Sequence, residues 1–348
     1  MSSTVVAHDT SFGTGRLAWA RRRGPDLLLT YGIYAALAGA FVYFALAAPN
    51  FLTGKNFQAI GYSVAVIGLL TVPFTIALVA GQVDLTVGIV IGLLSTVFQV
   101  VVINSGRSVV IGLVAMVLAA LLVGLVNGVI VVNFGVNSVV ATFATLQVVF
   151  GASYTLYKLG RTNAEGSGEF TTAISPGDAG YSVVRLANAH VLGVPVPVIV
   201  LAVVAFAGYL FLSRSKLGWH IYATGGNPSA ALRTGIRVNG LIRLVFVLTP
   251  LVAVLAALIT FGRTGTPDPG SGYQYEFDVL TAVLIGGIGL AGGSGTIGRS
   301  LAGALFVVLL KDGLSLMNVD SSIQFMIQSA ALILAVILVA LAAKRQQR

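Results

Sequence analysis

The 348-residue chain has no cysteine, three histidines and few charged residues. Without cysteine it can form no disulfide, no thiolate nucleophile and no cysteine-based metal site. His8, His190 and His220 are scattered, and their spacing fits neither a metal centre nor a Ser/His/Asp arrangement. Charged residues make up only 9% of the chain, against about a quarter in a soluble domain. The composition therefore excludes an ordinary soluble enzyme and offers no catalytic or metal-binding residues.

Apolar residues account for 57% of the chain, and the mean hydropathy is +0.96. These values predict an all-α polytopic membrane protein embedded in the lipid bilayer. The 42 glycines fit that class, because membrane helices approach one another closely at small residues. The net charge of +9 would suggest a nucleic-acid partner in a soluble protein, but here we interpret it as an orientation signal and expect no nucleic acid.

Runs of about 20 mostly apolar residues predict about ten transmembrane helices. They lie at 27–48, 58–80, 85–103, 109–133, 137–157, 194–213, 241–262, 275–292, 298–317 and 322–343. We expect one permease-like domain over 27–343, a basic tail at 1–26 and a short C-terminus at 344–348. The first run follows Arg21–Arg23 as a signal peptide would, but its 22 residues favour an uncleaved helix. The third and eighth runs border glycine-containing breaks, which indicates broken or re-entrant helices.

The positions of lysine and arginine predict that both termini face the cytosol. With that orientation 13 of the 20 basic residues lie inside and seven outside. The most basic internal segment, the loop 214–240, then lies in the cytosol, while the polar, turn-rich loop 158–193 lies outside and could receive a partner or cap a pore.

Within the inner loop the stretch 225–236 predicts a short capped helix. Asn227 suits the N-cap, Pro228 the first turn and Gly235 the left-handed residue that ends a helix. Its alanines and Leu232 form a small apolar face, which would either dock on another protein or pack on the same chain.

Three stretches resemble permease subunits of bacterial ABC sugar importers of the ribose, xylose and galactose type. They are ATGGNPSAALRTGI at 223–236, GQVDLTVG at 81–88 and AVLIGGIGLAGGSGTIG at 282–298. The resemblance covers roughly residues 30–343 and implies the fold of a type II ABC importer. It also implies that the chain moves a monosaccharide or related polyol across the bacterial inner membrane.

In that family the loop helix couples the permease to its ATPase. The residues that match by position are Gly225, Gly226, Asn227, Ala230, Ala231 and Gly235. Arg233 is shifted, because the family usually has arginine before leucine and this chain has Leu232-Arg233. The resemblance implies three partners: the ATPase subunits, an external solute-binding protein and a second permease copy. ATP and magnesium would be bound by the ATPase, and no cofactor by this chain, whose Gly54-Lys55 lacks the rest of a Walker loop.

The other two matching stretches carry residues with a structural interpretation. Asp84 matches the family aspartate, and we favour a cap on the third span over substrate contact. Gln82 places a side chain where the family has glycine. Residues 287–292 spell a dinucleotide fingerprint, but they end a membrane span, so Gly286, Gly287, Gly292 and Gly293 indicate close packing or a re-entrant turn. Gly88 and Gly92, like Gly124 and Gly128, are expected at close helix contacts.

A path for a neutral sugar needs amide and hydroxyl side chains without fixed charge. The best candidates are Asn127, Asn137, Thr142 and Gln147, although each could instead bond a neighbouring helix. Two other functions stay open. A branched-chain amino acid or nucleoside permease of the same superfamily is one, and an ion-coupled transporter, which usually needs more ionisable residues inside its spans, is the other.

Overall fold

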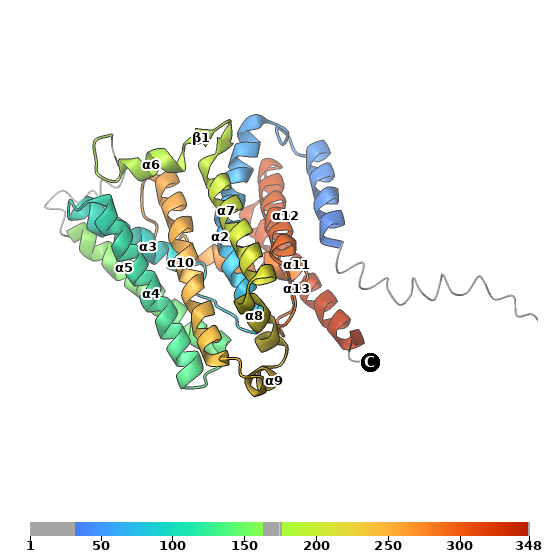
Figure 1. The fold of residues 1–348 in the computed structure, drawn as a ribbon. Helices are drawn as coiled ribbons and strands as arrows, with labels where there is room; N and C mark the ends of the chain where they lie inside the picture. The colour runs from blue at the N-terminus through green and yellow to red at the C-terminus, as the bar shows by residue number, and fades with distance from the viewer. Residues whose placement is uncertain (1–31, 163–173, 175, 347–348) are drawn as a thin grey trace, which may run out of the picture.

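The computed structural model describes residues 32–162, 174 and 176–346, and this part is mostly helical (Figure 1). A first helix covers Gly32–Ala47. The elements that follow are α2 (Gly54–Val79), α3 (Val90–Phe98), the π-helical η1 (Gln99–Asn104), α4 (Val109–Asn133), α5 (Ser138–Thr162), α6 (Tyr181–Ala187), β1 (His190–Val191), β2 (Val194–Pro195), α7 (Val196–Arg214), α8 (Lys216–Gly226), α9 (Pro228–Arg233), α10 (Val238–Thr264), α11 (Tyr273–Ile285), α12 (Ile297–Leu316) and α13 (Ser321–Gln346). The predicted tail 1–26 lies outside the described residues, as do residues 163–173 and 175 of the loop 158–193.

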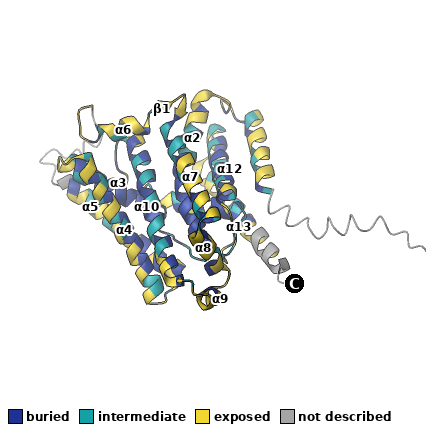
Figure 2. Cartoon of the chain, viewed as in Figure 1, coloured by how far each residue is buried: buried dark blue, intermediate teal, exposed yellow. Residues whose placement is uncertain are grey.

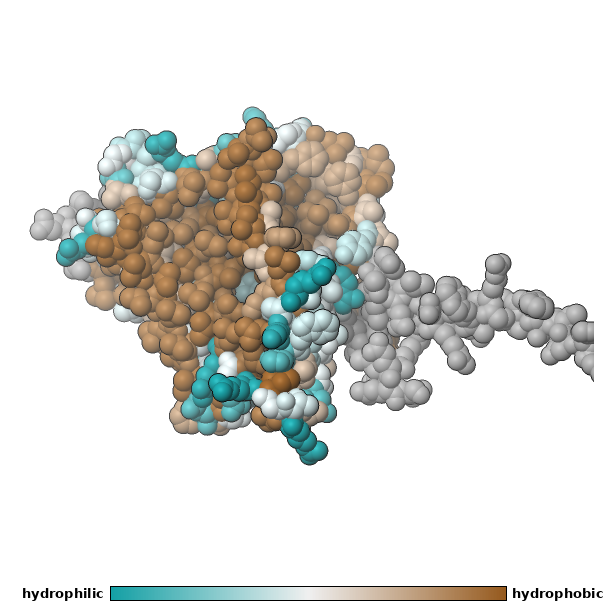
Figure 3. Space-filling view, in the orientation of Figure 1, coloured by the Kyte–Doolittle hydropathy of each residue, from teal (hydrophilic) through white to brown (hydrophobic). Residues whose placement is uncertain are grey.

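Five of the described helices are long and apolar enough to cross a membrane. They are α2, α4, the stretch Ser138–Gly160 of α5, α7 and α10. The space-filling view shows apolar side chains over the middle of the visible face, with hydrophilic residues gathered near α6 at one end and around α9 at the other (Figure 3). The chain is therefore a multi-pass membrane protein.

Helix α2 forms the centre of the bundle and packs against α7, α10, α11 and α12. Of its most apolar window, 89% is buried inside the protein, compared with 28% for α4 and 22% for α7. The exposed faces of α4 and α5 carry large apolar side chains such as Leu122 and Phe143 (Figure 2). Helices that are apolar all round need lipid or another subunit against such faces.

Two of the predicted spans are helical over only part of their apolar runs. The run 85–103 becomes helical only at Val90, because the chain makes a series of turns after Gly81, whose φ is 75°. The run 275–292 ends as a helix at Ile285, before Gly287 with φ 75°. The interruption of these two helices, predicted from their glycines, is confirmed.

The loops contain elements that the sequence reading did not predict. The inner loop has a second helix, α8, directly before α9. The loop 158–193 contains α6 and β1, and β1 pairs antiparallel with β2 directly after the loop, so that Val191 lies opposite Val194. The two loops lie at opposite ends of the bundle (Figure 1).

Candidate functional site

Helix α9 begins and ends with the caps that the sequence predicts. Asn227 accepts a hydrogen bond from the Ala230 N–H through its Oδ1 at 3.0 Å, and Pro228 occupies the first turn. At the other end Gly235 has φ 85°, and its N–H donates to the Leu232 carbonyl at 3.0 Å. The next N–H, that of Ile236, donates to the Ala231 carbonyl at 3.2 Å. This pair of bonds is a Schellman motif, so both ends of the short helix are satisfied.

The residues of α9 divide into an exposed and a buried group. Ala230, Leu232 and Arg233 are exposed, and Leu232 keeps 55% of its surface accessible. Ala231 is only 3% exposed. In the folded loop Ala231 therefore packs inward, and the surface that α9 offers to a partner consists of its exposed neighbours.

Glycines from three distant parts of the sequence meet behind this loop. We call the group Gly81, Gly225, Gly226, Gly292 and Gly293 the glycine junction. A Cβ on Gly225 would lie 1.8 Å from the Val79 carbonyl oxygen, and a Cβ on Gly292 would lie 2.8 Å from the Gly81 Cα. Each of the three stretches that carry the family resemblance contributes to this contact, and only glycine allows backbones to approach so closely.

Two hydrogen bonds fix the glycine-rich loop 286–296 against its neighbours at the junction. The Gly293 N–H donates to the Val79 carbonyl at the end of α2 at 2.8 Å. The Tyr222 hydroxyl of α8 donates to the Gly295 carbonyl at 2.6 Å. Burial raises the pKa of the Tyr222 phenol above its ordinary value, so the proton it donates is retained at neutral pH. The α8–α9 loop is thus tied directly to the segment that follows α11.

Asp84 accepts a backbone N–H bond, as predicted, but it does so in the turns before α3 and not at the N-cap of that helix. Its Oδ1 accepts from the N–H and hydroxyl of Thr86, which stabilises the turns between α2 and α3. Helix α3 starts at Val90 after Ile89, which has no side-chain cap. The Ile89 N–H instead donates to Glu276 of α11 at 3.1 Å. The carboxylate of Glu276, which is far away in the sequence, therefore accepts a hydrogen bond from a backbone N–H at the start of α3.

Close contacts are present at Gly88 and Gly124, as predicted, although only that of Gly124 lies between two helices. A Cβ on Gly88, in the turns before α3, would lie 2.4 Å from the carbonyl oxygen of Gly272, the residue before α11. A Cβ on Gly124 would lie 2.6 Å from the Phe246 carbonyl oxygen of α10. Gln82, where the family has glycine, is half-buried beside Gly81, and its N–H donates to the Ala77 carbonyl at 2.9 Å.

The four candidate path residues do not come together. Thr142 is fully buried and accepts a hydrogen bond from the Leu85 N–H at 3.1 Å. Asn127 is also fully buried and donates to the Thr86 hydroxyl at 3.2 Å. Asn137 directly precedes α5, and its Oδ1 accepts a hydrogen bond from the Val139 N–H at 2.9 Å. Gln147 is exposed on α5. The alternative, in which a candidate bonds a neighbouring part of the bundle, holds for Thr142 and Asn127, whose partners lie in the turns before α3, whereas the bond of Asn137 is local to the start of α5.

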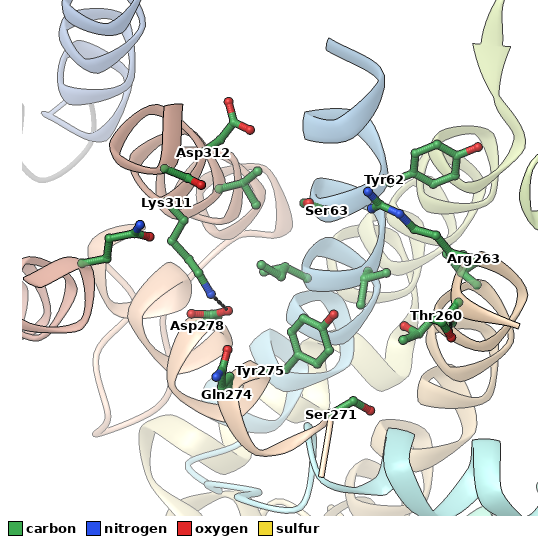
Figure 4. Close-up of a pocket in the computed structure, with 17 residues that line it drawn as sticks. Tyr62, Ser63, Thr260, Arg263, Ser271, Gln274, Tyr275, Asp278, Lys311 and Asp312 are labelled. Carbon is green, nitrogen blue, oxygen red and sulfur yellow. Dashed lines mark hydrogen bonds and ion pairs between the residues drawn. The ribbon is translucent and has the colours of Figure 1, made fainter. Parts of the chain in front are cut away.

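A polar cavity that the sequence did not predict is shown in Figure 4, and its lining helices place it toward the end of the bundle opposite α9 (Figure 1). It has a volume of about 500 Å³ and is lined mainly by α2, α10, α11 and α12. The Lys311 ammonium and the Asp278 carboxylate form an ion pair at 2.7 Å in its lining. Arg263 lies over the ring of Tyr62, 5.0 Å from its centroid. The only sequence signal was ionisable residues near the ends of separate spans.

Comparison with known proteins identifies relatives over most of the chain. A family profile described as "Branched-chain amino acid transport system / permease component" matches residues 56–341. The L-arabinose ABC transporter permease protein AraH of Azospirillum brasilense is 33% identical over 92% of this chain and 91% of its own. The ribose import permease protein RbsC of Escherichia coli K12 is 32% identical, covering 83% of this chain and 87% of its own. The autoinducer 2 import system permease protein LsrD of Enterobacter sp. strain 638 is 29% identical over 78% and 80%. No solved structure matches the chain.

Proposed function

Because the chain belongs to the family described as permease components of branched-chain amino acid transport systems, we propose that it is the membrane-spanning subunit of an ABC importer for a monosaccharide or related polyol. The arabinose and ribose permeases, each more than 30% identical over most of both chains, support a sugar over an amino acid. The family description keeps a branched-chain amino acid as the second candidate. In this proposal the importer lies in the bacterial inner membrane, and an external solute-binding protein delivers the sugar.

The observation that carries the proposal is the glycine junction. It joins the α8–α9 loop to the C-terminal end of α2 and to the loop after α11, through contacts that leave no room for a side chain. A displacement of α9 must therefore move these segments, because close-packed backbone cannot absorb it. In the proposed mechanism the ATPase binds ATP and magnesium, docks on the exposed residues of α9 and moves that helix during its cycle.

This assignment divides the predicted coupling residues into two roles. Ala230, Leu232 and Arg233 are exposed and form the docking surface. Gly225 and Ala231 are buried and hold the loop in place. A charge at the first group should prevent docking without unfolding the chain, whereas a charge at the second group should destabilise the loop itself.

The proposed topology has ten spans with both termini in the cytosol. Each of the ten apolar runs overlaps a described helix, and the lysine and arginine distribution favours this orientation. A second permease copy is proposed to pack on the side of the bundle formed by α5 and α11. Phe143 and Phe277 are 54% and 56% exposed there and line an apolar groove.

The test is co-purification of the chain with its ATPase from native membranes, followed by transport assays in proteoliposomes. We expect Leu232→Glu to lose the ATPase and ATP-driven transport while the melting temperature of the chain stays unchanged. Ser182→Glu, an exposed substitution on α6 at the opposite end, is the control and should retain both. Uptake of L-arabinose or D-ribose, and not of L-leucine, would support the sugar class. Transport under an ion gradient without any ATPase would contradict the proposal.

A further inference from the structure

The polar cavity is lined by residues of one chain (Figure 4), and its lining helices α2 and α10 place it toward the end of the bundle opposite the α8–α9 loop (Figure 1). Its volume of about 500 Å³ lies within the range of roughly 300–1,000 Å³ common for small-molecule sites. We propose that this cavity binds one molecule of a neutral, polyhydroxylated solute within each permease chain. The proposal rests on the proposed function, and it adds a binding site that is separate from any path between two permease copies.

The charges of the cavity favour a neutral ligand because they are balanced within the protein. Lys311 pairs with Asp278, and Asp312 accepts a hydrogen bond from Asn56 at 2.9 Å. Arg263 lies over the Tyr62 ring, where a cation is stabilised by the π-system. An anionic ligand would meet the two aspartates, and a cationic ligand would meet the two basic residues.

The remaining lining groups suit a sugar in particular. Side chains converge on the cavity from several helices around the Tyr275 phenol, including the hydroxyls of Ser63 and Thr260 (Figure 4). Gln274 and Gln324 add amides, which both donate and accept hydrogen bonds. A sugar hydroxyl also donates and accepts, and an aromatic ring such as that of Tyr275 can cover its apolar C–H face. Few purely apolar solutes would favour such a lining over lipid.

Helix α11 separates the cavity from the side of the bundle that faces α5 and α13. Gln274 and Asp278 line the polar cavity and also a second groove, between α11 and α13. The C-terminal end of α11 leads into the loop 286–296, which contributes Gly292 and Gly293 to the glycine junction. A shift of α11 linked to α9 would therefore change access to the bound solute, which connects the site to the ATPase cycle.

The experiment measures equilibrium binding of tritiated L-arabinose and D-ribose to the permease–ATPase complex in nanodiscs, without ATP or binding protein. We expect saturable binding of one sugar per permease chain. Ser63→Phe on α2 and Ser315→Phe on α12 fill the cavity from two different helices and should each weaken binding at least tenfold. Ser182→Phe adds the same side chain at the same end of the molecule, on α6 and outside the cavity, and should leave binding unchanged. Co-purification of the ATPase with each variant confirms folding.

The outcomes separate this inference from the proposed function. If wild type transports a sugar and both cavity variants bind and transport it as well as wild type, the cavity site is overturned and the importer assignment stands. If the complex binds L-leucine instead, with the same sensitivity to the two variants, the polyhydroxylated class and the sugar assignment both fail. Sugar binding that only the two cavity variants weaken supports the site.

Discussion

At the scale of single residues, Gly225 shows how narrowly the junction is built. An added Cβ would lie 1.8 Å from the Val79 carbonyl oxygen and 2.6 Å from the Gly293 nitrogen, and both are backbone atoms that cannot rotate away. We predict that Gly225→Ala destabilises the chain by about 1–3 kcal/mol, the usual cost of overpacking. ATP-driven transport should fall more steeply, because the contact that links α9 to the membrane helices is forced apart. Thermal unfolding in detergent and proteoliposome transport would measure the two effects.

The matched control for that substitution is Gly240→Ala, near the start of α10. A Cβ there would meet no atom closer than 3.9 Å, so stability and transport should stay close to wild type. If both glycine variants behaved alike, close approach at the junction would not be what requires glycine at position 225.

Residues whose structural role is local could be predicted from the sequence. Asn227 and Gly235 act on backbone groups within a few positions, so cap chemistry alone identified them. The burial of Ala231 depends on how distant segments fold together, and nothing in its neighbouring residues reveals it. The same limit explains why Glu276, which caps α3 from another helix, was missed.

At the scale of elements, α9 is a helix of only six residues that depends on its caps. Removing the Asn227 side chain with Asn227→Ala should cost about 1 kcal/mol of helix stability. We expect faster amide hydrogen exchange across 229–233 and weaker ATPase binding. Asn227→Asp keeps an oxygen acceptor for the Ala230 N–H and should exchange like wild type. Equal exchange in the alanine and aspartate variants would show that tertiary contacts alone hold α9.

Helix α11 is held by a polar clamp to two other helices. The buried Asp278 accepts hydrogen bonds from Lys311 of α12 and Gln328 of α13. Lys311→Met would leave the carboxylate buried without its cation, and we predict a loss of roughly 3 kcal/mol or more in stability. Adding Asp278→Asn removes the stranded charge, so the double variant should recover much of the loss. Melting temperatures in nanodiscs test this, and a double variant less stable than Lys311→Met would contradict the account.

Helix boundaries were predictable where the chain is regular and not where it turns inside the protein. The run 109–133 coincides with α4, and 298–317 differs from α12 by one residue at each end. The run 85–103 was drawn too long, because Val87 and Ile89 are apolar and buried although they belong to turns. A buried turn has the composition of a membrane helix, so hydropathy cannot distinguish the two.

At the scale of the whole molecule, the family-like motifs and the polar cavity occupy opposite ends of the bundle. The motifs meet at the glycine junction beside the α8–α9 loop, and the cavity lies near the ends of α10 and α12 and the start of α11. The sequence predicted the first region because its residues are grouped in three recognisable stretches. It could not predict the second, whose lining residues are spread from Tyr62 to Gln324 with no common spacing.

The predicted orientation decides whether α9 can reach an ATPase at all, and the absence of cysteine makes it directly measurable. A single cysteine introduced into this chain is its only thiol, so an impermeant maleimide reports that position without background. Ser229→Cys on the exposed side of α9 should react only after cells are permeabilised, because the basic loop 214–240 is retained in the cytosol. Ser182→Cys on α6 should react in intact cells. The reverse pattern would place α9 outside, away from ATP, and the docking role proposed for Leu232 and Arg233 would then be impossible.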